Sequence, residues 1–355
     1  MGQAFAGTCN FMGNDSLDRS ERGWQGISPE SKIPTIMEAA GLRARSSAKL
    51  EWLPSRMRAA VCFTVDDVHP GKSSDAYEAG GDLNRGDLRH LEWLLDRHPR
   101  LRVTLFVTAD WREISPFATR SILAKIPLLR NRVFLADVLP RGTMRLGRHP
   151  DFVTYLKSLP RVDCALHGLH HVNRGTSIAA EFKGQSRTKC ELLLQKTIEI
   201  FNEAGLAYSP GMCPPSWELS DELAEAMIAT GLKFVASARD IRTPITPGAA
   251  NSMSGRKGVS LFYPERIMKG RLLHFCTNFQ ATSPIKRAHQ IVELNGLIAI
   301  KAHIIKVAAS HTALDGLDEL YRNYLHNLFT ELEDRYGDEL WWTSMAEITN
   351  RCDAQ

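Results

Sequence analysis

The chain has 355 residues, enough for one large domain or two ordinary ones, and 43% of them are hydrophobic. That apolar content is sufficient for a sizeable core and excludes a disordered chain. The net charge of +4 is unevenly spread, because ten Lys or Arg and only three Asp or Glu lie between Arg112 and Arg161. The remaining residues are slightly acidic, so a uniformly basic surface for nucleic acid is not expected.

Features of export and of membrane insertion are not seen in the sequence. No run approaches the roughly 18–20 apolar residues of a membrane-spanning helix, and the first residues lack the basic and apolar regions of a secretory signal. The seven cysteines of the chain are scattered and form no C-x-x-C pair, which is typical of reduced thiols rather than of disulfides or structural zinc. We therefore expect a cytoplasmic protein.

Residues 1–58 are mixed and polar, with one candidate helix at 32–42, and we expect an N-terminal extension that packs on the main domain. From residue 59 onward, short apolar runs alternate with amphipathic stretches. The expected strands are 59–65, 102–108, 162–166, 207–212, 233–236, 271–275, 296–302 and 339–343. The expected helices are 87–97, 189–204, 221–230 and 315–336, and 243–259 is expected to be a long mobile loop. This alternation favours an α/β barrel or a doubly wound sheet.

The first cluster of polar residues is Asp66-Asp67, which closes the apolar run of the first strand. Reactive groups of α/β folds collect where strands end at their carboxyl edge. Two adjacent carboxylates repel each other and lose hydration there, so a cation or a shared proton makes the pair tolerable. Because side chains alternate along a strand, the two aspartates can serve different tasks. A helix cap or a turn is the alternative interpretation.

The second cluster follows the strand at 162–166 and contains His167 and His171. Two histidines four residues apart lie on the same side of a helical turn and can ligate one ion, and imidazole nitrogen suits zinc and similar divalent metals. With a carboxylate from the Asp pair, they form a metal site with open positions. Two ordinary polar residues are the alternative, and by its spacing His170 points elsewhere.

The third cluster is His303, at the end of the apolar strand around Ile298. An imidazolium at this position can act as a general acid and protonate a leaving amine. A polar residue at a strand exit is the alternative.

The order of these clusters, with a proline-rich strand end between them, resembles the polysaccharide deacetylase family over about residues 59–348. The resemblance implies a distorted (β/α) barrel of about seven strands, here residues 59–350, and metal-dependent hydrolysis of N-acylated sugars. It implies one divalent metal, taken as zinc with nickel, cobalt or manganese as alternatives. The implied roles are Asp66 as catalytic base, Asp67, His167 and His171 as metal ligands, and His303 as general acid.

The resemblance also implies a substrate groove. Pro214 and Pro215, followed by Trp217, match the groove-forming proline motif, and Trp217 is a candidate for stacking on a pyranose or for the core. His69, Tyr77 and Asp82 are further candidates for contact with the sugar. Trp341-Trp342 and the residues from Met345 to Ile348 resemble the closing strand and helix of distant members.

The sequence also departs from the family pattern. Val68 and Gly168 replace the usual Gly and Ser or Thr, and Met212-Cys213 stand where an arginine normally contacts the catalytic aspartate. Asp240 is only a loose match to the aspartate–tryptophan motif. We also expect a backbone N–H near Cys213 to help stabilise the oxyanion that forms when water attacks the amide.

The basic insertion 112–161 indicates what else the substrate carries. Within it, 116–132 is expected to form a basic amphipathic helix, which can lie on a membrane surface, grip phosphate or pack on the core. The expected substrate is therefore an N-acetyl or N-formyl amino sugar on a nucleotide- or lipid-linked precursor of a surface polysaccharide, deacylated at the inner face of the membrane. A non-catalytic glycan-binding barrel and a metal-dependent carbohydrate esterase are the alternatives.

Overall fold

The computed structural model describes residues 52–72, 86, 88–304, 307–308 and 311–354. Most of the expected N-terminal extension 1–58, including the helix at 32–42, lies outside the described residues. Of its last residues, Trp52 and Leu53 are buried in a cluster with Ala60, Cys62 and Ala299.

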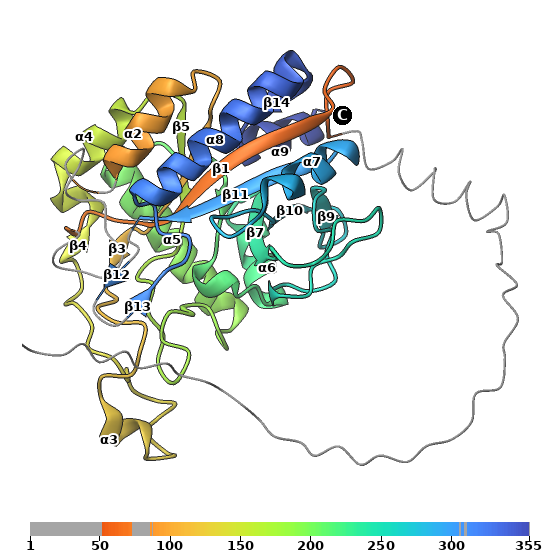
Figure 1. The fold of residues 1–355 in the computed structure, drawn as a ribbon. Coiled ribbons are helices and arrows are strands. Elements are labelled where there is room, and N and C mark those ends of the chain that lie inside the picture. The colour runs from red at the N-terminus through yellow and green to blue at the C-terminus, as the bar shows by residue number, and fades with distance from the viewer. Residues whose placement is uncertain (1–51, 73–85, 87, 305–306, 309–310, 355) are drawn as a thin grey trace, which may run out of the picture. The chain divides into compact units, whose positions relative to one another are not determined.

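A ten-stranded sheet, mostly parallel, forms the centre of the described chain, with its main path in the order β11-β1-β2-β5-β6-β7-β10-β9 (Figure 1). These strands are β1 Ala59–Val68, β2 Val103–Val107, β5 Val162–Leu166, β6 Gly211–Met212, β7 Phe234–Arg239, β9 Glu265–Ile267, β10 Leu272–Thr277 and β11 Leu297–His303. β14 (Leu340–Trp342) pairs with β1, and β8 (Ser254–Gly255) pairs with β7. Two small antiparallel sheets join β3 (Asp110–Trp111) to β4 (Met144–Arg145), and β12 (Val307–Ala308) to β13 (His311–Thr312).

The sheet closes on itself between β10 and β11, through the residues that follow β10. Asn278 accepts a hydrogen bond from the backbone N–H of Ala299 and donates to the carbonyl of Leu297, and Phe279 forms a parallel bridge with Ile300. A side-chain amide thus replaces part of a regular ladder at the seam. The expectation of a distorted barrel is confirmed, and the open doubly wound sheet is excluded.

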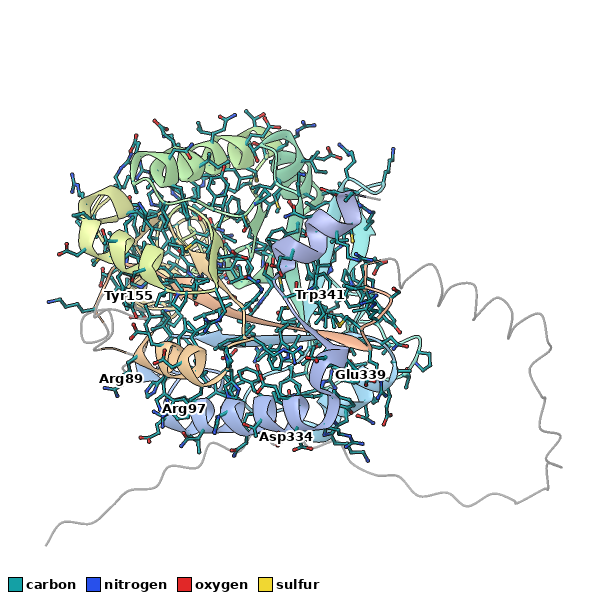
Figure 2. All side chains as sticks on the ribbon, turned by 90° about the horizontal axis from the view of Figure 1, so that it is seen from above. Arg89, Arg97, Tyr155, Asp334, Glu339 and Trp341 are labelled. Atoms are coloured by element: carbon teal, nitrogen blue, oxygen red, sulfur yellow. The ribbon has the colours of Figure 1, made fainter. Side chains whose placement is uncertain are left out.

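Helices cover the outside of the barrel. They are α2 Leu88–Arg97, α4 Pro150–Ser158, α5 Arg187–Glu203, α6 Asp221–Ala229, α7 Ile285–Glu293, α8 Glu319–Tyr336 and α9 Met345–Asp353. Figure 2 shows Arg97 on α2 and Asp334 on α8 at the outer surface, where these two helices pack together. Phe63 and Val65 of β1 belong to the large core cluster that also contains apolar residues of these helices. Ala60 and Cys62, whose side chains lie on the opposite face of β1, belong to the smaller cluster inside the barrel.

Most expected elements are present, and their differences have local causes. The strand expected at 207–212 is reduced to Gly211–Met212, because Pro210 has no N–H to donate to a ladder. The helix expected from residue 315 begins at Glu319, where the Asp318 carboxylate accepts the N–H of Tyr321 at 2.8 Å and caps the first turn. Among the described residues, α3 (Ser121–Ala124), α4 and α7 were not expected, whereas α9 matches the closing helix that the resemblance implied.

The basic amphipathic helix expected at 116–132 is wrong. Only the four residues of α3 are helical there, and none of them is buried. Pro127 cannot continue a helix at an interior position, and the chain leaves it through turns. Instead of forming one long helix, the segment extends away from the barrel (Figure 1). Across the described residues, no helix combines the length and apolar character needed to cross a membrane.

Candidate active site

The site begins at the end of β1, where Asp66 and Asp67 are both buried. In a regular strand, consecutive side chains point to opposite faces. Here the register between β1 and β2 shifts between Val65 and Val68, and Asp67 has a left-handed φ of 61°. Ligand-capable atoms of both aspartates consequently lie within 4.8 Å of those of His167. A backbone conformation that is unfavourable for aspartate thus brings two neighbouring carboxylates to one site.

Both histidines of the second cluster contact Asp67. Its Oδ1 atom lies 2.6 Å from His167 Nε2 and 3.0 Å from His171 Nε2. The expectation that one helical turn holds the pair is wrong, because residues 167–171 are not helical. Gly168 has a φ of +89°, and a Cβ there would lie 2.4 Å from Glu181 Oε2. The buried Glu181 carboxylate accepts the N–H groups of Leu169 and His170, both at 2.9 Å, which explains why glycine stands at residue 168.

The ring orientation of His167 and of His171 is fixed by a hydrogen bond of the Nδ1 atom, on the side of the ring away from Asp67. His167 Nδ1 is 2.6 Å from the carbonyl oxygen of Cys213, which can only accept, so Nδ1 carries the hydrogen. His171 Nδ1 is likewise 2.5 Å from the buried Glu113 carboxylate. In the neutral tautomers, both Nε2 atoms therefore turn a lone pair toward Asp67. Three acceptors that converge in this way are stabilised by a cation among them or by protons on the imidazoles, and a carboxylate with two back-bonded imidazoles is a donor set typical of zinc.

Charge also favours a cation beside Asp67. Burial raises its pKa, but the attraction and hydrogen bonds of His171 and His167 outweigh this and hold the pKa well below the usual value. Burial lowers the pKa of His171, but Asp67 and Glu113 outweigh this and raise it well above the usual value. The carboxylates of this group thus strongly favour positive charge on their imidazole neighbours.

Asp66 has different partners from Asp67. Its Oδ2 atom is 2.7 Å from the ammonium of Lys301 and 3.2 Å from the thiol of Cys213, which donates to it. Lys301 is almost fully buried, and its ammonium also lies 3.7 Å from the centre of the Trp217 ring. A cation so close to Asp66 disfavours a metal ion on this carboxylate. Lys301 thus supplies the cation beside Asp66, next to the thiol of Cys213.

His303 lies opposite Asp66 in the register of β1 and β11. Its Nδ1 atom is 3.0 Å from Asp315 Oδ1, and its Nε2 atom is 3.3 Å from Asp67 Oδ2. Burial raises the pKa of Asp315, but His303, Lys301 and Arg239 outweigh this and lower it well below the usual value. Asp315 is therefore an anion that orients the imidazole of His303.

Asp240, the loose match to the aspartate–tryptophan motif, does not reach His303 and instead holds a loop. Its carboxylate accepts hydrogen bonds from the N–H groups of Arg242, Thr243 and Ser252. These contacts anchor the start and the middle of the segment expected to be a long mobile loop.

The residues expected to contact substrate lie in several places. Trp217 is partly exposed, and its ring centre is 6.4 Å from that of His303. Pro214 and Pro215 are buried beside it. A backbone N–H near Cys213 was expected to stabilise the oxyanion, but the N–H of Cys213 itself donates to the carbonyl of Leu166 and is not free. His69 is fully buried and stacks on Trp111, with ring centres 4.2 Å apart. Tyr77 and Asp82 lie outside the described residues.

Several residues of the site were not anticipated from the sequence: Trp111, Glu113, Glu181, Lys301 and Asp315. Lys301 carried a usable signal, since it is a charged residue in an apolar strand, two positions before His303 and thus on the same face. Asp315 carried none, because it was assigned to the start of a helix. Glu113 and Glu181 lie in irregular segments where no periodicity marks a buried carboxylate.

No family model matches the sequence, and no curated protein matches it. A solved structure of a provisionally named polysaccharide deacetylase from Mycobacterium smegmatis matches with a TM-score of 0.50 and 14% identity, over 85% of this chain and 92% of that one. A 4-alpha-glucanotransferase from Thermococcus litoralis matches with a TM-score of 0.48 and 10% identity, over 83% and 40%. A CE4 family pseudoenzyme from Bacillus anthracis matches with a TM-score of 0.41 and 12% identity, over 82% and 66%. The first of these likenesses shows the fold that the sequence resemblance implied.

Proposed function

Starting from the polysaccharide deacetylase fold, we propose that this protein is a metal-dependent hydrolase that removes an N-acyl group from an amino sugar. The observation that carries the proposal is the division of labour between two neighbouring carboxylates. Asp67 faces the Nε2 atoms of two histidines, whereas Asp66 faces the ammonium of Lys301. One aspartate is thereby suited to hold a metal, and the other is left to accept a proton.

The metal would be held by Asp67, His167 and His171. A divalent ion such as zinc at that position supplies a Lewis acid that acidifies a water and polarises the amide carbonyl. Glu113 and the carbonyl of Cys213 hold the two imidazoles in the orientation that such binding needs.

The proton transfers fall to Asp66 and His303. The water oxygen bonds to the carbonyl carbon of the amide while Asp66 takes a proton from that water. The C–N bond then breaks, and His303 delivers a proton from Nε2 to the departing amine. The products are a free amino sugar and a short carboxylate such as acetate or formate. Lys301 and Asp315 act as positioning residues for Asp66 and His303, respectively.

The direct test compares Asp66→Asn with His171→Ala and with Asp334→Asn as a matched surface control. We expect Asp66→Asn to lose turnover of an N-acetyl amino sugar by at least about 100-fold, while elemental analysis finds the metal still bound. His171→Ala should lose the metal itself, and Asp334→Asn should behave as wild type. Near wild-type turnover in Asp66→Asn sinks the mechanism. A wild-type protein that binds metal but cleaves only esters favours the esterase, and one that binds glycan without any turnover favours the non-catalytic barrel.

The finer substrate assignment is a phosphate-bearing precursor of a surface polysaccharide, nucleotide- or lipid-linked. The excess of basic residues in 112–161 supports it, since phosphates are the anions that such a segment attracts. The partly exposed Trp217 beside His303 offers an aromatic face to a sugar. Activity on a free N-acetyl sugar that equals activity on its diphosphate-linked form would contradict this assignment.

Membrane contact through the segment 116–132 is also part of the proposal, as a peripheral association at the inner face of a cytoplasmic membrane. Five large apolar side chains of this segment are exposed, most strongly Ile122 (76%), Leu128 (74%) and Phe117 (53%). Basic residues stand among them, including Lys125, Arg130 and Arg132. Apolar side chains surrounded by positive charge match the interface of an anionic bilayer.

Vesicle flotation tests this association. We expect the full chain to float with phosphatidylglycerol-containing vesicles and to remain unbound with phosphatidylcholine alone. Ile122→Ser/Leu128→Ser should abolish flotation, whereas Leu314→Ser/Leu320→Ser, at two exposed leucines elsewhere, should not. Equal flotation of the two double variants, or concentration-dependent dimerisation through the segment, would contradict the membrane contact.

A further inference from the structure

A second cavity, of about 720 Å³, lies between α5 and the residues around β4. None of the proposed metal ligands lines it. Its volume falls within the range of about 300–1,000 Å³ that is usual for small-molecule sites. The chain thus holds room for a ligand at a place that the proposed reaction does not use.

This cavity adjoins the candidate metal site through two pairs of adjacent residues. Asp110 and His170 line the cavity, and His170 Nδ1 donates to the backbone carbonyl of Asp110 at 2.9 Å. Their sequence neighbours Trp111 and His171 stack on each other on the side of the metal site, with ring centres 4.5 Å apart. The cavity and the metal site are therefore separate but share these two backbone segments.

The cavity lining is strongly basic. Arg141, Arg145 and Arg148 come from the basic insertion, and Lys189 and Lys196 come from α5. Over the described residues, Arg145 forms an ion pair with Glu203, but the side chains of the other four form no hydrogen bond or ion pair. Such a group of cations without counter-charges raises the electrostatic potential of the cavity and favours an anion.

The acidic residues of the lining do not neutralise these cations. Asp110 is buried, and its carboxylate already accepts the N–H of Gly142, at 2.8 Å to the nearer oxygen. Glu199 is the other acid, set against five basic side chains. Burial and, second, the charge of Arg141 lower the pKa of Arg112, consistent with excess positive charge on this side of the molecule.

Between the basic residues, the cavity has an apolar surface. Leu169, Leu193 and Ile200 are buried, and Leu192 is exposed among the lining residues. A free inorganic anion would leave this apolar area wet, whereas an organic molecule with a charged group covers it. Guanidinium and ammonium groups together suit phosphate oxygens.

We infer that this cavity is a second ligand site, which binds a phosphate ester or diphosphate of a small organic molecule. The inference does not depend on the proposed hydrolase. The phosphate can belong to the substrate itself or to a separate phosphorylated metabolite, and both sources use the same cations and the same apolar surface.

Isothermal titration of the full chain with uridine diphosphate tests the site. The titration is performed on metal-loaded protein and on protein stripped of metal with a chelator that is then removed, so that binding to a metal cannot be mistaken for binding to the cavity. We expect binding in both preparations, with an affinity that falls as the salt concentration rises.

Two double variants of equal charge change locate the binding. Arg148→Ala/Lys196→Ala should raise the Kd by at least about tenfold. Lys257→Ala/Lys286→Ala, which removes two exposed lysines away from the cavity, should leave the Kd unchanged. Absence of binding to metal-free wild type, or equal Kd values for the two double variants, overturns the inference.

Kinetics then distinguish the two sources of phosphate. If the cavity takes the phosphate of the substrate, uridine diphosphate should compete with a diphosphate-linked N-acyl sugar. If a separate metabolite binds there, uridine diphosphate should change turnover of an unphosphorylated N-acyl sugar without competing with it. Both patterns require the proposed site. If uridine diphosphate affects the turnover of neither substrate, the site has no role in the reaction.

Discussion

Charged residues are concentrated both at the ends of the barrel strands and in the segment 112–148. At the strand ends they are buried and paired, whereas several in the segment are exposed and have no ion-pair partner among the residues that the structure describes. At the strand ends, Asp66 lies 2.7 Å from Lys301, and His303 lies 3.0 Å from Asp315. In the segment, Lys125 and Arg148 are exposed, and within the described structure their side chains have no ion-pair partner. Buried charges are costly unless they are paired, whereas exposed ones remain in water. The first region is therefore built to orient its own groups, and the second is left able to meet a ligand.

The largest expected difference comes from removing one cation in each region. Lys301→Met leaves the Asp66 carboxylate buried beside apolar groups, and we expect it to lower the free energy of unfolding by about 3–5 kcal/mol. The matched change Lys125→Met, at an exposed lysine, should stay within about 0.5 kcal/mol. Urea denaturation of both variants measures this, and equal stability losses would erase the contrast between the two regions.

Asp315→Asn tests whether pairing at the strand ends serves orientation. The amide keeps the size of the side chain but removes the charge that fixes His303, so kcat should fall roughly 100-fold with KM little changed. Circular dichroism and elemental analysis should find the fold and the metal content unaltered. If KM rises instead and kcat is retained, Asp315 belongs to substrate binding and not to the orientation of His303.

A glycine-to-alanine change in each region compares how strictly the backbone is constrained there. Gly168→Ala forces a side chain onto a left-handed residue and into the Glu181 carboxylate, so it should cost about 1–3 kcal/mol and weaken metal binding. Gly147→Ala, in the basic segment, meets no atom within 4 Å and should be nearly neutral. Thermal melts and metal titration check both, and comparable losses would show that Gly168 has no special role.

The smallest effect concerns pH and a buried histidine of β10. Burial lowers the pKa of His274 from the ordinary 6.5 to about 3, so the unfolded chain takes up a proton before the folded one does. The stability that His274 contributes is present above pH 6.5 and is lost as the pH falls toward 3.

His274→Gln should therefore reduce the acid-side slope of unfolding free energy by up to about 1.4 kcal/mol per pH unit. Denaturation at several pH values checks this, with His326→Gln as a control on α8. An unchanged slope would show that other groups dominate the acid response.

Local patterns predicted much of this protein. The strand 162–166 is found as expected, and the helix expected at 221–230 begins at Asp221, where Ser220 accepts the N–H of Leu223. These features depend on apolar runs and capping residues that are close in sequence. The helix expected at 116–132 is not found, because turns and prolines outweighed an amphipathic spacing.

Asp67, His167 and His171 were predicted from the sequence and lie together in the structure, but the contacts that position them were not predicted. A β1–β11 register that opposes Thr64 to Lys301 and Asp66 to His303 depends on residues more than 200 positions apart. The pair of Asp315 and His303 spans only 12 positions, but it was missed because Asp315 was assigned to the start of a helix that begins at Glu319.

The sequence by itself determined which side chains stand at the strand ends and where the excess positive charge lies, since both follow from composition and short-range pattern. Only the tertiary structure decided how those side chains pair. Left-handed backbone at Asp67 and Gly168, and the closure of β10 onto β11 through Asn278, are sustained by contacts between distant segments. The net charge of +4 combines an excess of seven positive charges in 112–161 with an excess of three negative charges in the rest of the chain. At the strand ends, the buried charges are paired, because only water or an opposite charge can accommodate an ion.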